Sequence, residues 1–168
     1  MNEEVAVIAL GSNLGDRLAH LRWGARALED LGEVTGRSSL YETDPVGGPS
    51  GQEAYLNAVV LLKPSEAYAD PNVLLKKLLG LEQKRGRERR ERWGPRILDM
   101  DLLTFGSRVL ESPDLTLPHP RMMERAFVLV PLCEVAPDFV HPVSGQKACE
   151  GLEGLETTGV RRTPLVWN

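Results

Sequence analysis

Two carboxylates that are one residue apart, Asp99 and Asp101, lie in an apolar stretch at residues 97–105. This stretch is rich in branched residues and contains neither Pro nor Gly, which is typical of a β-strand. Side chains alternate along a strand, so both carboxylates point to one face, about 6.5 Å apart. Three apolar residues point to the other face, into a core: Leu98, Met100 and Leu102. Such a carboxylate pair is costly to desolvate without a counter-charge, and Mg²⁺ is a suitable partner, although a solvated strand face with two acids is the alternative.

A basic segment, KRGRERRERWGPR, occupies residues 84–96, directly before the strand that carries the two carboxylates. Seven Lys and Arg residues against two Glu give this segment a net charge of +5, in a chain whose net charge is −4. A basic segment in an acidic chain is typical of a local anion site rather than a general nucleic-acid surface. Arg holds phosphate through its planar fork, and Gly86, Gly94 and Pro95 indicate a loop. A charged helix end is the alternative, but the position beside the carboxylates predicts a metal-assisted phosphoryl site.

The composition is that of a small globular protein. At 168 residues and 42% hydrophobic content, residues 1–168 are expected to form one domain with a buried core. Cys133 and Cys149 lack a metal-type spacing, and we expect a reduced chain, with a disulfide as the open alternative. The first residues, MNEEVAVIAL, carry acids where a signal peptide carries positive charge, and their apolar run is too short to span a membrane. We therefore expect a soluble, cytoplasmic protein.

Hydrophobic periodicity predicts an α/β chain. Apolar runs predict strands at residues 5–10, 34–43, 55–62 and 97–105. A turn is expected at 11–13, where Asn13 or Asp16 can cap a helix that Gly32 stops. Further helices are expected at 72–84, with Val73, Leu74, Leu78 and Leu81 on one stripe, at 122–135, interrupted by Pro131, and near 146–152, before an extended piece that ends at Trp167. Since not every pair of strands is joined by a helix, a mixed or antiparallel sheet with helices packed on it is expected.

Five motifs occur in the order that is found in the 6-hydroxymethyl-7,8-dihydropterin pyrophosphokinase family, which the chain resembles up to about Pro142. They are ALGSNLGDR at 9–17, YETDPVG at 41–47, YLNAVV at 55–60, RWGPRILDMDLL at 92–103 and LPHPRMMERAFVLVPL at 117–132. Enzymes of this family belong to the folate pathway and transfer pyrophosphate from ATP to a pterin alcohol. The resemblance implies a ferredoxin-like α/β (α+β) sandwich, with a mainly antiparallel central sheet and helices packed on it.

The resemblance also implies how the phosphates are bound. Asp99 and Asp101 would hold two Mg²⁺ ions that bridge the phosphates of ATP, the co-substrate. The mobile arginine loop of the family matches Arg87, Arg89, Arg92 and Arg96. Of these, Arg87 and Arg96 are the expected catalytic residues, because they would stabilise charge as it develops. Further nucleotide-binding residues are implied at Glu82, His119 and Arg125, although a lone His119 could equally be a surface or capping histidine.

The pterin site is implied by a second set of residues. Tyr55 and Phe127 would flank the ring, Asn57 would read its edge, and Thr43 and Val46 would supply backbone and wall contacts. Core packing is the alternative for the two aromatic residues. Trp93 would seal the closed site against water. The sequence Gly11-Ser12-Asn13 lacks the Walker lysine and is interpreted as a structural turn.

Two other classes of protein remain open from the residues alone. A metal-dependent nucleotidyltransferase also combines a Gly-Ser turn with an Asp-x-Asp strand, and a non-enzymatic module could bind anions through its arginine loop. The expected partners are ATP and 6-hydroxymethyl-7,8-dihydropterin. No nucleic acid, membrane or obligate protein partner is expected.

Overall fold

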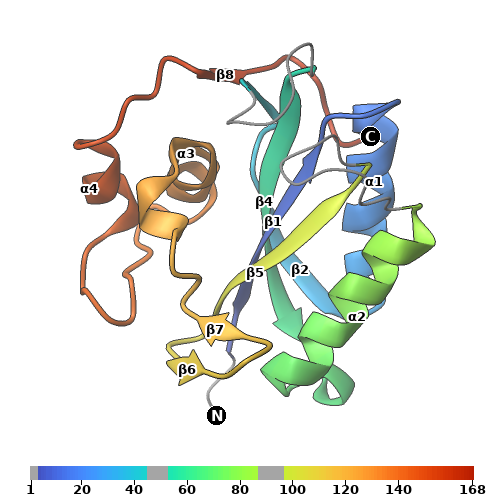
Figure 1. Cartoon of the computed structure of the whole chain (residues 1–168), viewed down its shortest axis with the longest axis vertical. Coiled ribbons are helices and arrows are strands. Elements are labelled where there is room, and N and C mark those ends of the chain that lie inside the picture. The colour runs from blue at the N-terminus through green and yellow to red at the C-terminus, as the bar shows by residue number, and fades with distance from the viewer. Residues whose placement is uncertain (1–3, 45–52, 87–96) are drawn as a thin grey trace.

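The computed structural model of the chain describes residues 4–44, 53–86 and 97–168. Its centre is a six-stranded sheet in the order β5-β1-β4-β3-β8, with β2 also paired to β4 (Figure 1). Every pairing in this sheet is antiparallel. The strands are β1 (Ala6–Ser12), β2 (Gly32–Arg37), β3 (Tyr41–Thr43), β4 (Tyr55–Pro64), β5 (Asp99–Phe105) and β8 (Val160–Arg162). A separate two-stranded sheet contains β6 (Leu110–Glu111) and β7 (Thr116–Leu117).

Helices cover both faces of the sheet (Figure 1). One face carries α1 (Arg17–Leu28) and α2 (Pro71–Lys84), and the other carries α3 (Ala126–Val135) and α4 (Ala148–Leu152). Short 3₁₀ turns precede α2 at Glu66–Tyr68 and α3 at Met122–Glu124. The units β1–α1–β2 and β4–α2–β5, with spatial order β5-β1-β4-β2, make this a ferredoxin-like fold, as expected.

Alternation along β1 explains why there are two cores. Ile8 and Leu10 pack with α1 and α2 in the larger core, whereas Val7 packs with α3 residues in the smaller one. Leu98, Met100 and Leu102 are also buried in the larger core, as the strand pattern predicts. The strand that carries both carboxylates is therefore fixed from behind by apolar packing.

The helix starts follow the sequence signals. Asp16 caps α1, where its side chain accepts a 3.1 Å hydrogen bond from the backbone of Ala19. α1 ends at Leu28, and Gly32 does not stop it but begins β2. A Cβ at position 32 would lie 2.1 Å from the Lys63 carbonyl oxygen, so this close strand approach requires glycine.

Several predicted elements need correction. The expected strand at 34–43 is split into β2 and β3, because both segments pair with different parts of β4. The expected turn at 11–13 begins later, because pairing with β4 extends β1 through Ser12. Val73 lies off the buried stripe of α2 and is 43% exposed. Pro131 does not interrupt α3, which begins at Ala126 after a separate 3₁₀ turn.

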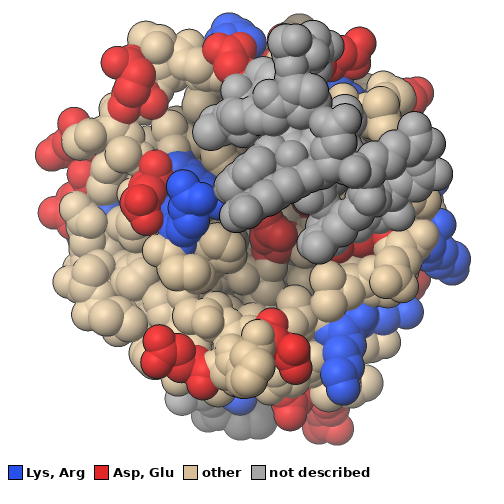
Figure 2. All heavy atoms as spheres, in the orientation of Figure 1, with Lys and Arg blue, Asp and Glu red and all other residues tan. Residues whose placement is uncertain are grey.

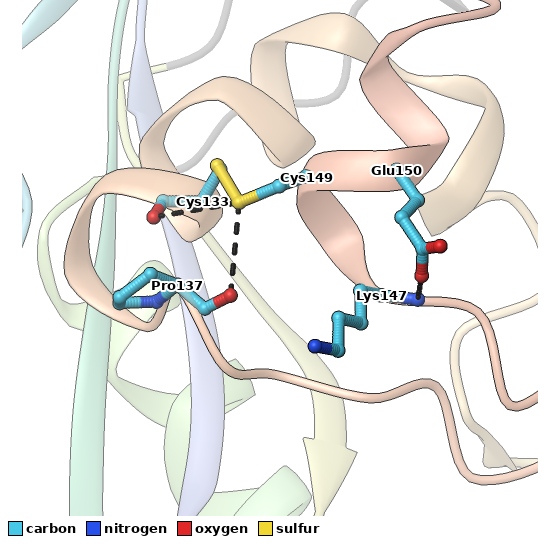
Figure 3. The surroundings of a disulfide bond; sticks show 5 residues. All are labelled: Cys133, Pro137, Lys147, Cys149 and Glu150. Atoms are coloured by element: carbon cyan, nitrogen blue, oxygen red, sulfur yellow. Dashed lines mark hydrogen bonds between the residues drawn. A yellow bond between two sulfur atoms is a disulfide. The ribbon is translucent and has the colours of Figure 1, made fainter.

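The expectation of reduced cysteines is wrong. Cys133 on α3 and Cys149 on α4 form a disulfide, with their Cα atoms 5.2 Å apart (Figure 3). A spacing of 16 residues in the sequence does not predict this approach, which depends on how α3 and α4 pack.

Within the described ranges, no helix has both the length and the hydrophobicity needed to cross a membrane.

Candidate active site

A cleft of about 870 Å³ opens on the sheet face that carries α3. Its floor is formed by β1, β4 and β5, and its walls by β3, the start of α3 and the segment before β8. All of the predicted pterin and metal residues that the structure describes line it: Thr43, Tyr55, Asn57, Asp99, Asp101 and Phe127. Residues from four distant parts of the sequence thus meet in one cleft.

Asp99 and Asp101 lie on the same face of β5, as the alternation predicts. They pair across the sheet with Gly11 and Ala9 of β1, two small residues that leave space above the floor. Among the described residues, no group of three or more His, Cys, Asp or Glu could hold a metal ion. Mg²⁺ is commonly bound by one or two carboxylates together with phosphate oxygens and water, so the donor set fits this cation.

A second hollow, of about 350 Å³, lies on the other side of β5. It is lined by α2, β5, the β6–β7 connection and the residues after β7, among them Glu82, Asp101 and His119. Asp101 therefore borders both hollows. Asp101 lies where a ligand in the cleft and a ligand in the second hollow would meet, with Asp99 beside it in the cleft.

His119 is held firmly in the wall of the second hollow. Its backbone N–H donates to the Leu103 carbonyl at 2.7 Å, and its ring Nδ1 accepts from the Arg121 N–H at 3.2 Å. Burial, followed by Arg125 and Arg121, lowers the pKa of His119 against the opposing effect of Asp101. A lowered pKa favours the neutral ring, and because Nδ1 accepts the Arg121 N–H, the ring nitrogen left as a donor is Nε2.

Arg125 brings positive charge to the cleft opposite the carboxylates. Its guanidinium lies over the Phe127 ring, 5.6 Å from the centroid, and both residues line the cleft. Burial and the neighbouring Arg121 lower the pKa of Arg125, but it stays charged at neutral pH. One face of the Phe127 ring is thus covered by the Arg125 guanidinium. This contact helps to fix the orientation of the ring at the start of α3.

Glu82 has a structural contact that the sequence did not predict. The side chain is 2% exposed, and its Oε2 accepts a 2.7 Å hydrogen bond from the backbone N–H of Met100. β5 is an edge strand, so this N–H would otherwise lack a partner strand. Glu82 thereby fixes the residue between Asp99 and Asp101 while it also lines the second hollow.

Asn57 and Thr43 form the buried polar end of the cleft. The Asn57 Nδ2 donates to the Thr43 Oγ1 at 2.6 Å. A Cβ at Gly11 would lie 2.6 Å from the Asn57 Oδ1, so the amide occupies the space that a side chain would fill. The sequence predicted Gly11 as part of a turn, whereas it lies inside β1, where a glycine permits such a close approach.

Some cleft residues had no signal in the sequence, and some predicted residues are outside the described ranges. The first group includes Asp44 and three residues around the start of β8: Thr158, Gly159 and Val160. The second group comprises Val46, Arg87, Arg89, Arg92, Trp93 and Arg96. α2 ends at Lys84, and Gly86 has φ +98°, so the helix stops where the predicted arginine loop begins.

Comparisons with known proteins point to a single family. The model of the family described as 7,8-dihydro-6-hydroxymethylpterin-pyrophosphokinase matches residues 7–137. A protein of Synechocystis sp. is 45% identical over 157 residues, which cover 92% of this chain and 78% of that protein. A Bacillus subtilis protein is 46% identical over 133 residues, covering 78% of this chain and 77% of the relative. Both carry the name 2-amino-4-hydroxy-6-hydroxymethyldihydropteridine pyrophosphokinase.

Solved structures share the fold at low sequence identity. The crystal structure of Plasmodium falciparum HPPK-DHPS with pteroate superposes with a TM-score of 0.74 at 14% identity. The match covers 96% of this chain and 48% of that one, so this chain spans about half of its length. The family match and the relatives above 40% identity together show that the chain belongs to the 7,8-dihydro-6-hydroxymethylpterin-pyrophosphokinase family.

Proposed function

We propose that this chain transfers pyrophosphate from ATP to the hydroxymethyl group of 6-hydroxymethyl-7,8-dihydropterin and releases AMP, in tetrahydrofolate biosynthesis. Family membership supports this reaction, and the observation that carries it in this chain is the position of Asp101 between the two hollows. A pterin in the cleft and a nucleotide in the second hollow would place their reacting groups beside the same carboxylates. Such a shared position makes an intermolecular transfer effectively intramolecular.

The cleft suits a flat ring with hydrogen-bonding edges. Asn57 supplies an amide to read the pterin edge, and Thr43 orients that amide through its hydroxyl. Tyr55 and Phe127 offer ring faces for stacking. Contacts from Val46 and Trp93 stay predictions, since both lie outside the described residues.

The second hollow suits a nucleotide. Leu75 and Leu79 offer an apolar surface to a base, and the neutral His119 offers an N–H donor to a phosphate oxygen. Glu82 also lines this hollow, whereas Arg125, the other proposed nucleotide contact that the structure describes, lines the neighbouring cleft. The phosphate contacts of Arg87, Arg89, Arg92 and Arg96 stay predictions, with Arg87 and Arg96 proposed as catalytic.

Asp99 and Asp101 are proposed to hold two Mg²⁺ ions. When bound, the cations would neutralise phosphate charge and align the attacking and leaving oxygens. In the transfer, the pterin hydroxyl oxygen forms a bond to the β-phosphorus, the bond from that phosphorus to the α,β-bridging oxygen breaks, and the hydroxyl proton is released to water. With its Nδ1 occupied by the Arg121 N–H, His119 is proposed to act as a hydrogen-bond donor to phosphate rather than as a base. Positioning and charge neutralisation are therefore proposed to provide most of the rate.

Action in the cytoplasm, without nucleic acid, membrane or an obligate protein partner, is also proposed. On the face shown in Figure 2, acidic and basic side chains of the described residues are interspersed, and neither sign forms a continuous surface there. The net charge of the chain, −4, also disfavours a nucleic-acid partner. The relatives give no support to the nucleotidyltransferase or the anion-binding module.

The decisive experiment is product analysis with ATP and Mg²⁺, with and without 6-hydroxymethyl-7,8-dihydropterin. The proposal predicts AMP and pterin diphosphate in equal amounts, formed only when the pterin is present. ADP formation would identify a simple kinase, and release of inorganic pyrophosphate with transfer of AMP would identify a nucleotidyltransferase. Absence of any pterin-dependent product would reject the transfer reaction.

The metal assignment makes a separate prediction. Asp99→Ala and Asp101→Ala are each expected to lower kcat by about three orders of magnitude, because the phosphate charge is no longer neutralised. Pterin affinity, measured by fluorescence titration, should change little. Asp138→Ala, an exposed position outside both hollows, is the control. Substantial turnover in both cleft variants would remove the carboxylates from the metal site.

A further inference from the structure

We infer that Arg17 and Arg161 act through Glu42 as positioning residues for the pterin end of the cleft. Neither arginine lines the cleft or the second hollow, and neither was predicted to belong to the site. The inference rests on the proposed function for its ligand, and goes beyond it by assigning a role to the start of α1 and to β8. It concerns how the chain fixes the positions of the Thr43 and Asn57 side chains relative to each other.

Arg17 connects the two arms of the β3–β4 hairpin. Its Nη1 donates to the Ala54 carbonyl at 2.7 Å, and its Nη2 donates to the Glu42 Oε2 at 3.0 Å. Glu42 lies in β3, and Ala54 directly precedes β4. Thr43 and Tyr55 form the last rung between these strands. A single guanidinium at the start of α1 therefore sets the separation of the hairpin arms at the rung that borders the cleft.

Arg161 holds the same strand from its other edge. It pairs with Glu42 in the β3–β8 ladder. Its Nη2 donates to the Asp44 Oδ1 at 3.1 Å and lies 3.7 Å from the Glu42 Oε1. The backbone N–H of Asp44 also donates to the Gly159 carbonyl at 3.2 Å. The two oxygens of Glu42 are thus engaged by arginines from opposite ends of the sequence.

The path of the chain explains how β8 reaches this position. From α4 the chain crosses the end of the sheet as β8 and then continues to a C-terminus beside α1 (Figure 1). Arg22 of α1 donates to the Val166 carbonyl, and the Trp167 ring N–H donates to the Ser38 carbonyl at 2.8 Å. The segment that follows Arg161 is therefore attached to α1 and to the residue after β2, and this attachment helps to hold β8 in place.

Strand β3 connects the charged contacts of Glu42 to the side of the sheet where the pterin is proposed to bind. Side chains alternate along β3, so Glu42 faces away from the cleft while Tyr41 and Thr43 are buried on the other face. The Thr43 hydroxyl accepts from the Asn57 amide, whose oxygen is packed above Gly11. A shift of Thr43 would therefore rotate or release the amide that is proposed to read the pterin edge.

The experiment compares Arg161→Ala and Arg17→Ala with the wild-type chain. Each variant is expected to raise the pterin Kd and KM about fivefold to tenfold, while kcat at saturating pterin and the KM for ATP stay within about twofold. Arg161→Lys should recover part of the affinity. Arg108→Ala is the matched control, because it breaks a 2.7 Å ion pair with Glu4 at the far end of β5. An unchanged pterin Kd in both cleft-side variants would overturn the inference.

A double-mutant cycle tests the route through Thr43. Thr43→Val removes the hydroxyl that orients Asn57, so adding Arg161→Ala to it should cause little further loss of affinity. Fully multiplicative losses would show that the arginine acts elsewhere. A general loss of stability would instead lower the unfolding midpoint and would affect both substrates together.

A readout without ligand separates this inference from the proposed function. The side-chain amide resonances of Asn57, assigned by NMR in the free protein, should move in Arg161→Ala and Arg17→Ala but not in Arg108→Ala. If the wild-type chain forms no AMP, the proposed function fails, and these resonances still decide the inference. Unmoved resonances would reject the positioning role even in an active enzyme.

Discussion

Gly11 shapes the buried polar end of the cleft, where the pterin is proposed to bind, by lacking a side chain. The Asn57 Oδ1 lies 2.6 Å from where a Cβ would be, and both residues are neighbours across β1 and β4. An alanine there would have to displace the buried amide, which is already committed to Thr43. The binding geometry at this point is thus decided by backbone and not by a functional group.

Gly11→Ala is therefore expected to weaken pterin binding by about tenfold or more, because a well-placed hydrogen-bonding amide is lost. Fluorescence titration measures the pterin Kd of the variant, and the KM for ATP should be nearly unchanged. Gly80→Ala is the matched control, since a Cβ at that exposed position in α2 meets no atom within 4 Å. The control should stabilise the chain by up to about 1 kcal/mol. Equal pterin affinity in both variants would contradict the role of Gly11.

At the scale of elements, α3 is attached to the sheet by a polar contact as well as by apolar packing. Glu134 accepts from the Ser39 N–H at 2.8 Å, the Ser39 hydroxyl at 2.6 Å and the Tyr41 hydroxyl at 2.9 Å. Burial raises the pKa of Tyr41 to about 12, and its bond to Glu134 adds to the shift. Burial alone would raise the pKa of Glu134, but these hydrogen bonds together with Arg162 lower it below 4.5.

This contact predicts a pH effect on stability. A carboxyl with a lowered pKa in the folded state stabilises the fold above its unfolded-state pKa, and the contribution is lost as the pH falls through the folded-state value. The unfolding free energy of the wild-type chain should therefore fall more steeply below pH 4.5 than that of Glu134→Gln. Urea unfolding at several pH values measures this difference. Parallel curves would show that Glu134 does not hold α3.

At the scale of the whole molecule, the sheet separates a larger and a smaller hydrophobic core, and a disulfide stabilises the helices that cover the smaller one. The core beneath α3 and α4 is the smaller one, and it is closed by the disulfide between Cys133 and Cys149 (Figure 3). A cross-link over a loop of this length restricts the unfolded chain and contributes about 3 kcal/mol. The start of α3 carries Phe127, so this reinforcement also supports one wall of the cleft.

The double variant Cys133→Ser with Cys149→Ser should therefore lose about 3 kcal/mol of unfolding free energy. Turnover at 25 °C should persist, since neither cysteine lines the described hollows. Urea unfolding with and without reductant measures the loss, and reductant should affect only the wild-type chain. The same curves test the prediction of one domain, which requires a single transition. A reductant-insensitive wild-type chain with two titratable thiols would contradict the disulfide.

Local patterns in the sequence determined the elements and much of the chemistry. The alternation around Asp99 and Asp101 was sufficient to place both carboxylates on one face, because side-chain direction in a strand depends only on its period of two. The ends of elements were less accurate at residues 34–43 and at Pro131, where pairing and packing override local preference. Motif order identified the family, from which Thr43, Asn57 and His119 followed as site residues.

Only the tertiary structure decided which residues meet. That Asp101 borders both hollows, that Glu82 holds Met100, and that Cys133 reaches Cys149 all depend on strand order and helix packing. The contacts of Arg17 with Glu42, 25 positions away, and of Arg161 with Asp44, 117 positions away, were not predicted, because such contacts leave no periodic trace in a single sequence. The hydrophobic period shows to which face of its own strand or helix a side chain points. Which distant residue it contacts depends on how the strands pair, and the sequence period does not contain that information.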